Sequence, residues 1–322
     1  MSALTAISPI SPIAFVSQAG ASEVQQWISA LQAAMPEERI LPFEQLDADQ
    51  LAQCRVAIVA NPDPAQLKRM PNLLWVHSVW AGVERLVADL GQSDLQLTRL
   101  VDPRLAATMA EAVLAWTLYL HRDMPLYAHR QREHHWEAQP YVLPEQRRVS
   151  LLGLGALGEA AAAALRQARF AVNGWSRSPR AVESVQTFHG PAGLAQMLAQ
   201  TDILVCLLPL TAETRGLIDA AHLAMLPPQA QLINFARGPI IDDAALKAAL
   251  DAGQLRHAVL DVFAVEPLPP EAWPWSHPAV TVLPHCSAPT DRQTASAIVA
   301  ANIRRYRHSG EIAANVDLRR GY

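Results

Sequence analysis

The sequence predicts an α/β protein built from two doubly wound domains, each with a mostly parallel sheet. Short apolar runs alternate with helical patterns along nearly the whole chain, which is typical of parallel sheets covered by helices. One apolar run leads into a glycine-rich turn at residues 153–158 and then into an alanine-rich helical segment. The 322 residues are enough for two domains of ordinary size.

The first hundred residues predict the smaller domain. Residues 23–35 have the pattern of an amphipathic helix with one apolar face, formed by Val24, Trp27, Ile28 and Leu31. The strands predicted around it cover residues 13–16, 39–42, 56–60, 73–77 and 95–99.

The fourth of these strands leads into a turn that contains Trp80, Ala81 and Gly82. Ligands of open α/β sheets bind just beyond the carboxyl ends of strands, and backbone N–H groups of this turn can hold a small carboxylate there. From this stretch alone, an ordinary strand-to-helix turn is at least as good an explanation.

A second series of strands follows a strongly apolar helix predicted at residues 110–121. Its predicted strands cover residues 148–152, 171–175, 202–209, 232–235, 258–263 and 280–283, and a helix is predicted at residues 295–306. Residues 139–146 carry prolines and predict an irregular connection, whereas residues 211–214 predict a loop that can cap a helix.

Residues 129–137 are rich in histidine, arginine and aromatic side chains. Their spacing differs from the HExxH pattern of zinc sites and no second cluster supports metal binding, so we expect no metal site. A solvated helix face or a contact between subunits explains the segment better.

Composition excludes several classes of protein. The chain is 51% hydrophobic and 17% charged, as in a globular protein with a sizeable core, and its net charge of −4 does not favour nucleic acid or membrane surfaces. Cys54, Cys206 and Cys286 are too far apart for a disulfide framework or a CxxC metal site. We found neither a clear signal sequence nor an apolar run long enough to span a bilayer, so we expect a cytoplasmic, reducing location.

The glycine-rich turn predicts a dinucleotide site, because its strand, turn and helix come in the order of a dinucleotide-binding unit. Gly153 permits the tight turn, Gly155 lets the backbone approach a pyrophosphate, and Gly158 lets the helix pack close to the strand. The N-terminus of the following helix offers free N–H groups and a positive dipole end to the phosphates.

The end of the next strand indicates which dinucleotide binds. Enzymes that prefer NAD usually place a carboxylate there for the ribose hydroxyls, but this chain has Ser176, Arg177, Ser178 and Arg180. Hydroxyl and guanidinium groups suit a 2′-phosphate, which a carboxylate would repel. We therefore expect NADP(H), with NADH less favoured. The alternative is that the two arginines lie on a solvated loop and bind no ligand.

Three later strands each lead to a polar side chain that can serve hydride transfer to a 2-keto acid: Arg237, Glu266 and His285. In a parallel sheet these groups share one edge with the glycine turn. An imidazole with a pKa near ~6.5 can protonate the carbonyl oxygen at neutral pH. Glu266 can fix the tautomer of His285, and Arg237 can grip the carboxylate and polarise the carbonyl.

The chain resembles the D-isomer-specific 2-hydroxyacid dehydrogenases over nearly its whole length. The matching motifs come in the order and spacing of that family, at residues 153–158, 207–214, 234–238, 260–269 and 284–285. The cofactor loop at residues 175–178 and the turn at residues 79–83 are most similar to the glyoxylate/hydroxypyruvate reductase A type. Phe235 is bulkier than the small residue often found before Ala-Arg-Gly, and Cys286 follows the histidine, which leaves details of cofactor affinity open.

This resemblance implies specific roles for these residues. Arg237 binds substrate, Glu266 orients His285, His285 is the acid/base, and Asp261 hydrogen-bonds the nicotinamide carboxamide. The substrate-binding set is Trp80, Ala81, Gly82 and Arg237. The cofactor-binding set is Gly153, Gly155, Ala156, Leu157, Gly158, Ser176, Arg177, Ser178, Arg180, Leu208, Pro209, Thr214, Phe235, Ala236, Asp261 and Ser287.

The resemblance also implies a domain arrangement. A discontinuous, flavodoxin-like substrate domain at residues 1–104 and 291–322 joins a Rossmann dinucleotide-binding domain at residues 105–290, with the active site in the cleft between them. A homodimer built on residues 110–121 and the arm that follows is expected.

The leading hypothesis is NADPH-dependent reduction of glyoxylate and hydroxypyruvate to glycolate and D-glycerate. The same chemistry on a larger 2-keto acid, such as phenylpyruvate, is a near alternative that depends on the volume of the pocket. A non-catalytic NAD(P)-sensing or corepressor protein is a third, against which an intact Arg237, Glu266 and His285 argue. A Rossmann-type methyltransferase would need an acidic residue at the ribose and has no use for these three.

Overall fold

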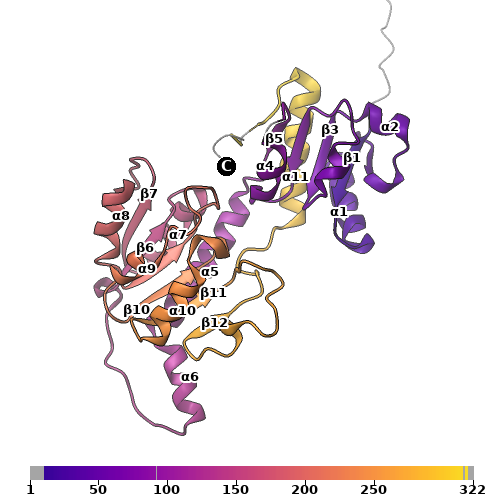
Figure 1. The fold of residues 1–322 in the computed structure, drawn as a ribbon. Helices are drawn as coiled ribbons and strands as arrows, with labels where there is room; N and C mark the ends of the chain where they lie inside the picture. Colours follow the sequence, from indigo (N-terminus) through magenta and orange to yellow (C-terminus); the bar gives the residue numbers. More distant parts are fainter. Residues whose placement is uncertain (1–10, 92, 315, 318–322) are drawn as a thin grey trace, which may run out of the picture. The chain divides into compact units, whose positions relative to one another are not determined.

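The computed structural model describes residues 11–91, 93–314, 316 and 317, and the chain divides into two compact units (Figure 1). Unit 1 comprises Met1–Asp102 and Thr290–Tyr322, and unit 2 comprises Pro103–Pro289. The boundaries proposed above, at residues 104 and 291, lie within two residues of these. The substrate-binding and dinucleotide-binding roles of the two units remain predictions.

Unit 1 contains a parallel sheet of five strands in the order β2-β1-β3-β4-β5. The strands are β1 (Ile13–Ser17), β2 (Ile40–Pro42), β3 (Val56–Ala60), β4 (Trp75–Ser78) and β5 (Gln96–Thr98). All five residues of β3 are buried, because helices cover both faces of the sheet. The strand order is that of flavodoxin-like sheets.

The helices of unit 1 bury opposite faces of this sheet. One core cluster joins Ile13 and Phe15 of β1 to α1 (Ala21–Ala34) and α11 (Arg292–Ser309). A second cluster joins Ala14 and Val16, the alternate residues of the same strand, to α2 (Ala48–Gln53), α3 (Pro64–Leu67) and α4 (Glu84–Leu90). A short 3-10 helix, η1 (Phe43–Gln45), packs beside them.

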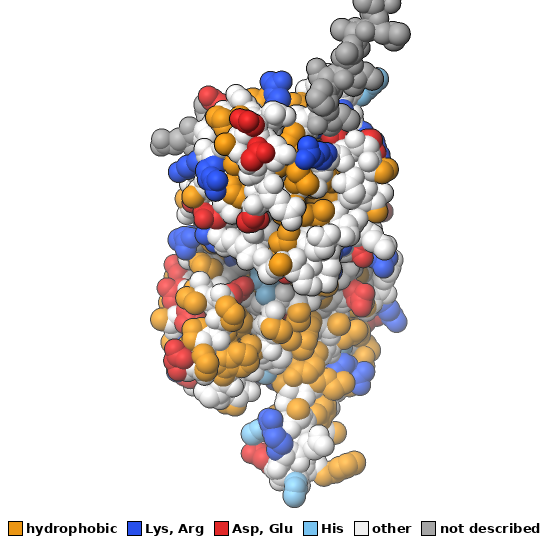
Figure 2. All heavy atoms as spheres, turned by 90° about the vertical axis from the view of Figure 1, so that its right-hand side faces the viewer, with side chains coloured by type: hydrophobic (Ala, Val, Ile, Leu, Met, Phe, Trp, Pro, Cys, Tyr) orange, Lys and Arg blue, Asp and Glu red, His pale blue; other side chains and the backbone are white. Residues whose placement is uncertain are grey.

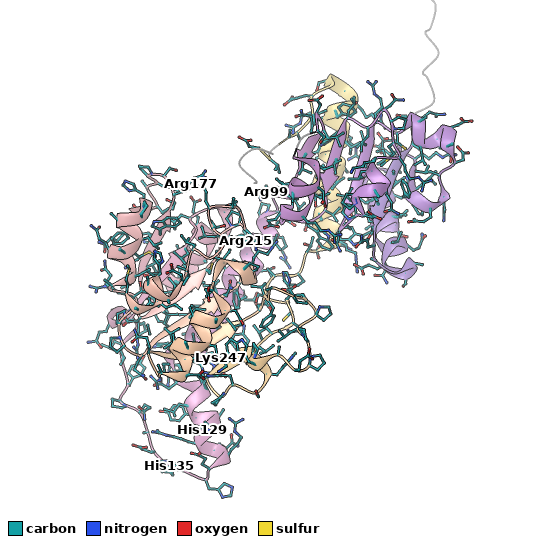
Figure 3. The ribbon with its side chains drawn as sticks, in the orientation of Figure 1. Arg99, His129, His135, Arg177, Arg215 and Lys247 are labelled. Carbon is teal, nitrogen blue, oxygen red and sulfur yellow. The ribbon has the colours of Figure 1, made fainter. Side chains whose placement is uncertain are left out.

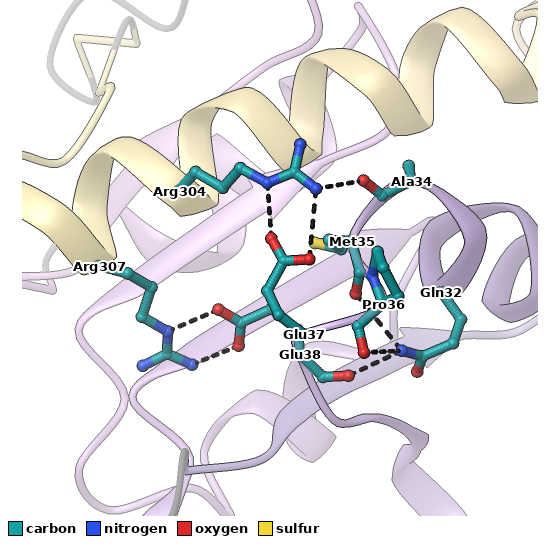
Figure 4. Close-up of polar contacts among 8 residues, drawn as sticks. All are labelled: Gln32, Ala34, Met35, Pro36, Glu37, Glu38, Arg304 and Arg307. Carbon is teal, nitrogen blue, oxygen red and sulfur yellow. Dashed lines mark hydrogen bonds and ion pairs between the residues drawn. The ribbon is translucent and has the colours of Figure 1, made fainter. Parts of the chain in front are cut away.

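Helix α11 belongs to unit 1 although it comes almost at the end of the chain. Two arginines of the helix form ion pairs with neighbouring glutamates in the connection between α1 and β2 (Figure 4). Arg304 Nε lies 2.5 Å from Glu37 Oε1, and Arg307 contacts both carboxylate oxygens of Glu38 at 2.9 and 2.8 Å. Glu38 is almost completely buried, so its charge needs this bidentate partner.

Unit 2 contains a parallel sheet of seven strands in the order β12-β11-β10-β9-β6-β7-β8. The strands are β6 (Arg148–Leu152), β7 (Ala171–Ser176), β8 (Gln186–His189), β9 (Ile203–Cys206), β10 (Ala230–Asn234), β11 (Leu255–Leu260) and β12 (Val280–Val282). All of these strands are parallel, but the order in which the chain adds them reverses between β6 and β9. Ligands of doubly wound sheets bind at such a switch point.

Helices again cover both faces of the sheet in unit 2. The core on one face involves α5 (Pro103–His121) and α7 (Ala156–Gln167), and the core on the other involves α8 (Gly190–Leu198), α9 (Ala220–Ala224) and α10 (Asp243–Asp251). Three 3-10 helices lie in connections: η2 (Pro144–Gln146), η3 (Gly238–Ile240) and η4 (Trp273–Trp275). The predicted fold class, two doubly wound parallel sheets, is confirmed.

Two local predictions were wrong or incomplete. Residues 211–214 cap no helix: Thr214 Oγ1 accepts from Thr211 N at 2.8 Å and donates to Pro209 O at 2.7 Å, which closes a turn, and α9 begins only after Asp219. The edge strand β8 was not predicted, because its four residues are half-buried or exposed and form no apolar run.

Helix α6 (Met124–Arg132) follows α5 and contains the first residues of the basic segment at residues 129–137. Figure 3 shows His129 and His135 at the tip of this arm, far from Arg177 in the same unit. Both histidines pair with carboxylates of the arm itself, His129 with Glu133 at 3.1 Å and His135 with Glu137 at 3.5 Å. Across the described ranges, no group of three or more His, Cys, Asp or Glu side chains is arranged to hold a metal ion.

Among the described residues, no helix is both long enough and apolar enough to cross a membrane.

Candidate active site

The glycine turn follows β6, an inner strand of the sheet, and each of its glycines meets a different geometric demand. Gly153 has a φ of +107°, which strains any residue with a side chain, and its N–H donates to Trp175 O at 2.9 Å. A Cβ atom on Gly158 would lie 1.9 Å from Gly153 O, so only glycine lets α7 pack this close to the turn. A Cβ on Gly155 would meet nothing within 4 Å, and this open position precedes the first residue of α7.

The N-terminus of α7 therefore presents its first N–H groups at an open glycine, which fits a pyrophosphate. Ala156 and Leu157 form the first turn of the helix with Gly158. Leu207 O of the loop after β9 lies 3.0 Å from the position of a Cβ on Gly153, so this loop and the glycine turn are in contact. Leu208 and Pro209 continue that loop, and Thr214 is tied to it through Pro209 O.

The basic loop after β7 lies beside α7. Ser176 Oγ donates to Ser178 O at 2.8 Å, which shapes the start of the loop. Arg180 contacts Glu159 of α7 at 2.5 Å, and Arg177 (Figure 3) contacts Glu213 at 2.5 Å. All four side chains are substantially exposed, and such pairs contribute only about 0–1 kcal/mol. A phosphate, which carries more charge, can therefore compete with these carboxylates for the guanidinium groups.

Arg237 lies in the loop after β10, and hydrogen bonds of Asn234 at the end of that strand hold this loop. Asn234, the last residue of β10, accepts from Ala236 N at 3.1 Å and donates to Arg237 O at 3.2 Å. A Cβ on Gly238 would lie 2.2 Å from the carbonyl carbon of Phe263, so the loops after β10 and β11 touch backbone to backbone. No role is predicted for Asn234 from the sequence, although a polar residue at the end of a buried strand could have indicated one.

His285 and Glu266 form a direct pair. His285 Nδ1 lies 2.7 Å from Glu266 Oε2, and the other carboxylate oxygen accepts from Phe263 N at 2.8 Å. The hydrogen bond that His285 donates to Glu266 raises the pKa of His285, against the opposing effects of burial and of Arg237. Burial raises the pKa of Glu266, but hydrogen bonds from His285 and Phe263 outweigh it and leave that pKa lowered. Because Nδ1 is bound to the carboxylate, Nε2 is the nitrogen left for proton transfer.

Asp261 holds the turn that carries His285. Its buried carboxylate accepts from Cys286 N at 2.8 Å and from Ser287 N at 3.0 Å, and its backbone carbonyl accepts from His285 N at 2.9 Å. These bonds support His285 in a left-handed conformation with a φ of +52°. The contact of Asp261 with a nicotinamide carboxamide remains a prediction beside this positioning role.

Three further residues predicted to contact the cofactor lie at the same edge of the sheet. Phe235 and Ala236 are buried directly after β10, and Phe235 N donates to Cys206 O at 3.2 Å. Ser287 is buried, and its Oγ has no hydrogen-bond partner within the described part of the chain. A buried hydroxyl normally has a partner, so this orphan suits a bound polar ligand.

The turn of Trp80, Ala81 and Gly82 lies in unit 1, directly after β4. Trp80 N donates to Ser78 Oγ at 3.0 Å, so the prediction that this N–H holds a carboxylate was wrong, and the proposal keeps only those of Ala81 and Gly82. The ring of Trp80 packs edge-on against Trp27 with centroids 5.6 Å apart. The predicted place of this turn, opposite His285 across a cleft, stays a prediction.

Unit 2 has the features of a nicotinamide dinucleotide-dependent oxidoreductase: its sheet topology, its glycine turn and its imidazole–carboxylate pair. Comparison with known proteins agrees. The family model described as D-isomer specific 2-hydroxyacid dehydrogenase, NAD binding domain, matches residues 114–287. The chain belongs to the D-isomer specific 2-hydroxyacid dehydrogenase family.

Solved structures of similar proteins support this assignment. A D-isomer specific 2-hydroxyacid dehydrogenase from Xanthobacter autotrophicus, in complex with NADPH and MES, is 41% identical over 97% of this chain and 100% of that chain, with a TM-score of 0.90. An NADPH-dependent glyoxylate/hydroxypyruvate reductase from Sinorhizobium meliloti, in complex with NADP and sulfate, is 34% identical over 97% and 100%, with a TM-score of 0.88.

A probable 2-hydroxyacid dehydrogenase from Rhizobium etli, in complex with NADP, HEPES and L(+)-tartaric acid, is 29% identical over 97% of this chain and 99% of that chain, with a TM-score of 0.87. The predicted family and the prediction of an NAD(P) cofactor are thus confirmed.

Proposed function

We propose that this protein uses NADPH to reduce small 2-keto acids, glyoxylate to glycolate and hydroxypyruvate to D-glycerate. The contact of 2.7 Å between His285 Nδ1 and Glu266 Oε2 carries this proposal, because it leaves a proton-donating imidazole at the sheet edge that also bears the glycine turn. The similarity to a reductase of glyoxylate and hydroxypyruvate from Sinorhizobium meliloti supports the choice of substrates.

The residues of this chain divide the work of the reaction. The dinucleotide, when bound at the glycine turn, supplies the hydride for the carbonyl carbon. His285 donates the Nε2 proton to the carbonyl oxygen, and Glu266 holds the ring and stabilises its protonated form. Arg237 binds the substrate carboxylate in fork geometry and polarises the carbonyl. Backbone N–H groups of Ala81 and Gly82 complete the carboxylate site, since the N–H of Trp80 is already donated to Ser78 Oγ.

A change in pH tests the pairing of Glu266 with His285. Reduction needs the protonated imidazole, which is present at low pH and is lost as the pH rises through the pKa of His285. Glu266 raises that pKa, so Glu266→Gln is expected to move the alkaline fall of kcat for keto-acid reduction to lower pH. The pH profile of kcat, measured with saturating NADPH and glyoxylate, checks this. An unchanged alkaline limb would contradict the role of Glu266.

A change of cofactor tests the basic loop. We expect Arg177→Ala together with Arg180→Ala to raise the KM for NADPH by about tenfold or more, because a charge-assisted bond is worth roughly 1.5–3 kcal/mol, and to leave the KM for NADH nearly unchanged. Arg169→Ala, which removes another exposed, paired arginine of unit 2, is the matched control. An equal rise in KM for NADPH and NADH, or a wild-type preference for NADH, would contradict binding of the 2′-phosphate by these arginines.

We further propose a homodimer that forms through α5, α6 and the arm after them. Figure 2 shows hydrophobic side chains on the arm, at the bottom of the view, and on the surface of unit 2 above it. Large hydrophobic side chains exposed in this stretch are Leu118, Met124, Tyr127, Trp136, Tyr141 and Leu143. Exposed apolar surface concentrated in one segment is typical of an interface. Sedimentation equilibrium of the wild type and of Trp136→Ala tests the proposal.

A panel of 2-keto acids tests the proposed reaction. NADPH oxidation, followed by its absorbance, is expected with glyoxylate and hydroxypyruvate at a higher kcat/KM than with phenylpyruvate. The reverse ranking would favour a reductase of larger keto acids. Tight NADPH binding without turnover of any keto acid would favour a sensor or corepressor.

A further inference from the structure

A polar path in unit 1, buried at His77 and Ser78 and half-buried at Asn302, joins helix α11 to the turn proposed to bind substrate. His77 of β4 is fully buried, with its Nδ1 3.0 Å from Ser78 O and its Nε2 3.0 Å from Asn302 Nδ2 of α11. A carbonyl oxygen can only accept, so Nδ1 carries the proton. Nε2 is then the acceptor for the amide of Asn302.

The direction of these bonds is consistent along the whole path. Asn302 Oδ1 accepts from Arg305 Nη2 at 3.3 Å, which leaves Nδ2 of the same amide as the donor to His77. Burial lowers the pKa of His77 to about 4, although the bond to Ser78 opposes it, so the ring is neutral near pH 7. A neutral ring with one donor and one acceptor matches its two partners.

The path ends at the first residue of the turn. Ser78 is fully buried, and its Oγ accepts from Trp80 N at 3.0 Å. The carbonyl of Trp80 accepts from Leu100 N at 3.0 Å, so the backbone of Trp80 is fixed at both of its polar groups. The strand end behind the turn has two supports: Val79 N donates to Val59 O at 2.9 Å, and Ser78 O accepts from His77 Nδ1.

Packing alone does not call for a histidine at this position. His77 pairs in register with Ile58 of β3, and Trp75 precedes it on the same face of β4. A hydrophobic side chain would fill that space without polar atoms to satisfy. The histidine adds two hydrogen bonds: one reaches Asn302, 225 residues away in the sequence, and the other is local and ends on Ser78 at the start of the turn.

We infer that His77 and Asn302 act together as positioning residues, which hold the turn at residues 78–82 in the shape that binds the carboxylate of the keto acid. This inference rests on the proposed function. It assigns no catalytic step to either residue. It predicts that loss of the path weakens keto-acid binding and leaves dinucleotide binding in unit 2 unaffected.

Three variants separate the two bonds of the ring. Asn302→Leu keeps a similar volume and removes the donor, and His77→Gln keeps an amide near the Nε2 position but lacks the donor to Ser78. Both are expected to raise the KM for glyoxylate roughly tenfold, because small misplacements of a binding group are costly, while kcat and the KM for NADPH stay within about twofold. His77→Asn keeps a donor near the Nδ1 position and lacks only the bond to Asn302, so its KM for glyoxylate is expected to rise as in Asn302→Leu.

Arg307→Leu is the matched control. It changes the same helix and breaks the buried pair with Glu38, so it lowers the Tm of the protein, but it does not touch the path. We expect its KM for glyoxylate to stay within about twofold of the wild-type value. If Arg307→Leu raises this KM as much as Asn302→Leu does, or if folded Asn302→Leu binds glyoxylate normally, the inference is overturned.

Hydrogen exchange gives a readout that needs no turnover. Amides of residues 78–82 are expected to exchange faster in Asn302→Leu and His77→Gln than in the wild type, and to be unchanged in Arg307→Leu. If the wild type reduces no keto acid, the proposed function fails while this comparison still tests the path. Unchanged exchange in Asn302→Leu would overturn the inference even in an active enzyme.

Discussion

Replacing His285 with alanine is expected to lower kcat for keto-acid reduction by about 10²–10⁴-fold, the usual contribution of a positioned general acid. The imidazole is the group that we assign to protonate the carbonyl oxygen, and alanine in its place offers no proton donor. The affinity for NADPH is expected to stay within about twofold, because the phosphates bind at the glycine turn. Steady-state kinetics and a titration of NADPH fluorescence measure both quantities.

His222→Ala is the control for this experiment. His222 belongs to the same unit and also pairs with a carboxylate, Asp219 at 2.8 Å, but it lies on α9, outside the candidate site. Its kcat is expected to equal that of the wild type. Near-normal turnover in His285→Ala would show that the proton comes from another group.

Replacing Arg237 with alanine is expected to lower kcat/KM for glyoxylate by about 10²–10³-fold or more, because one side chain both binds the carboxylate and polarises the carbonyl. The half-buried guanidinium is held by its bond to Ala236 O at 2.6 Å, so it is oriented before substrate arrives. Measurement of kcat and KM separately shows how the loss divides between binding and reaction.

Arg237→Lys is expected to recover only a small part of this activity, because an ammonium group offers a point charge where a planar fork is needed. Arg215→Lys, at an exposed arginine of the same unit, is the matched control and should behave as the wild type. Full activity in Arg237→Lys would mean that charge alone suffices, and full activity in Arg237→Ala would remove Arg237 from the site.

Much of the fold was predictable because its strands are buried apolar runs. The sheet positions of β3, β6 and β9 lie in core clusters on both faces, and each was found from hydrophobicity alone. The half-exposed edge strand β8 gave no such signal. The glycine turn was predictable for a different reason, since Gly153 and Gly158 meet geometric demands that no other residue can satisfy.

The candidate site was predictable only in part. Parallel strands bring their carboxyl ends to one edge, which is why His285 and Glu266 could be paired before their contact was seen. The supporting bonds of Asp261 to the backbone of Cys286 and Ser287 depend on local loop conformation, which no residue pattern specifies. His77 and Asn302 are 225 residues apart in sequence, and neither carries a motif, so their contact emerges only from the folded unit.

The central claim is that His285 and Arg237 act on a 2-keto acid beside a bound dinucleotide. A crystal structure of the protein with NADPH and oxamate, an analogue that resists reduction, tests it most directly. We predict that His285 Nε2 and the guanidinium of Arg237 both lie within about 2.7–3.2 Å of oxamate oxygens, with the N–H groups of Ala81 and Gly82 at its carboxylate. Oxamate bound elsewhere, or a His285 ring turned out of reach of it, would contradict the account.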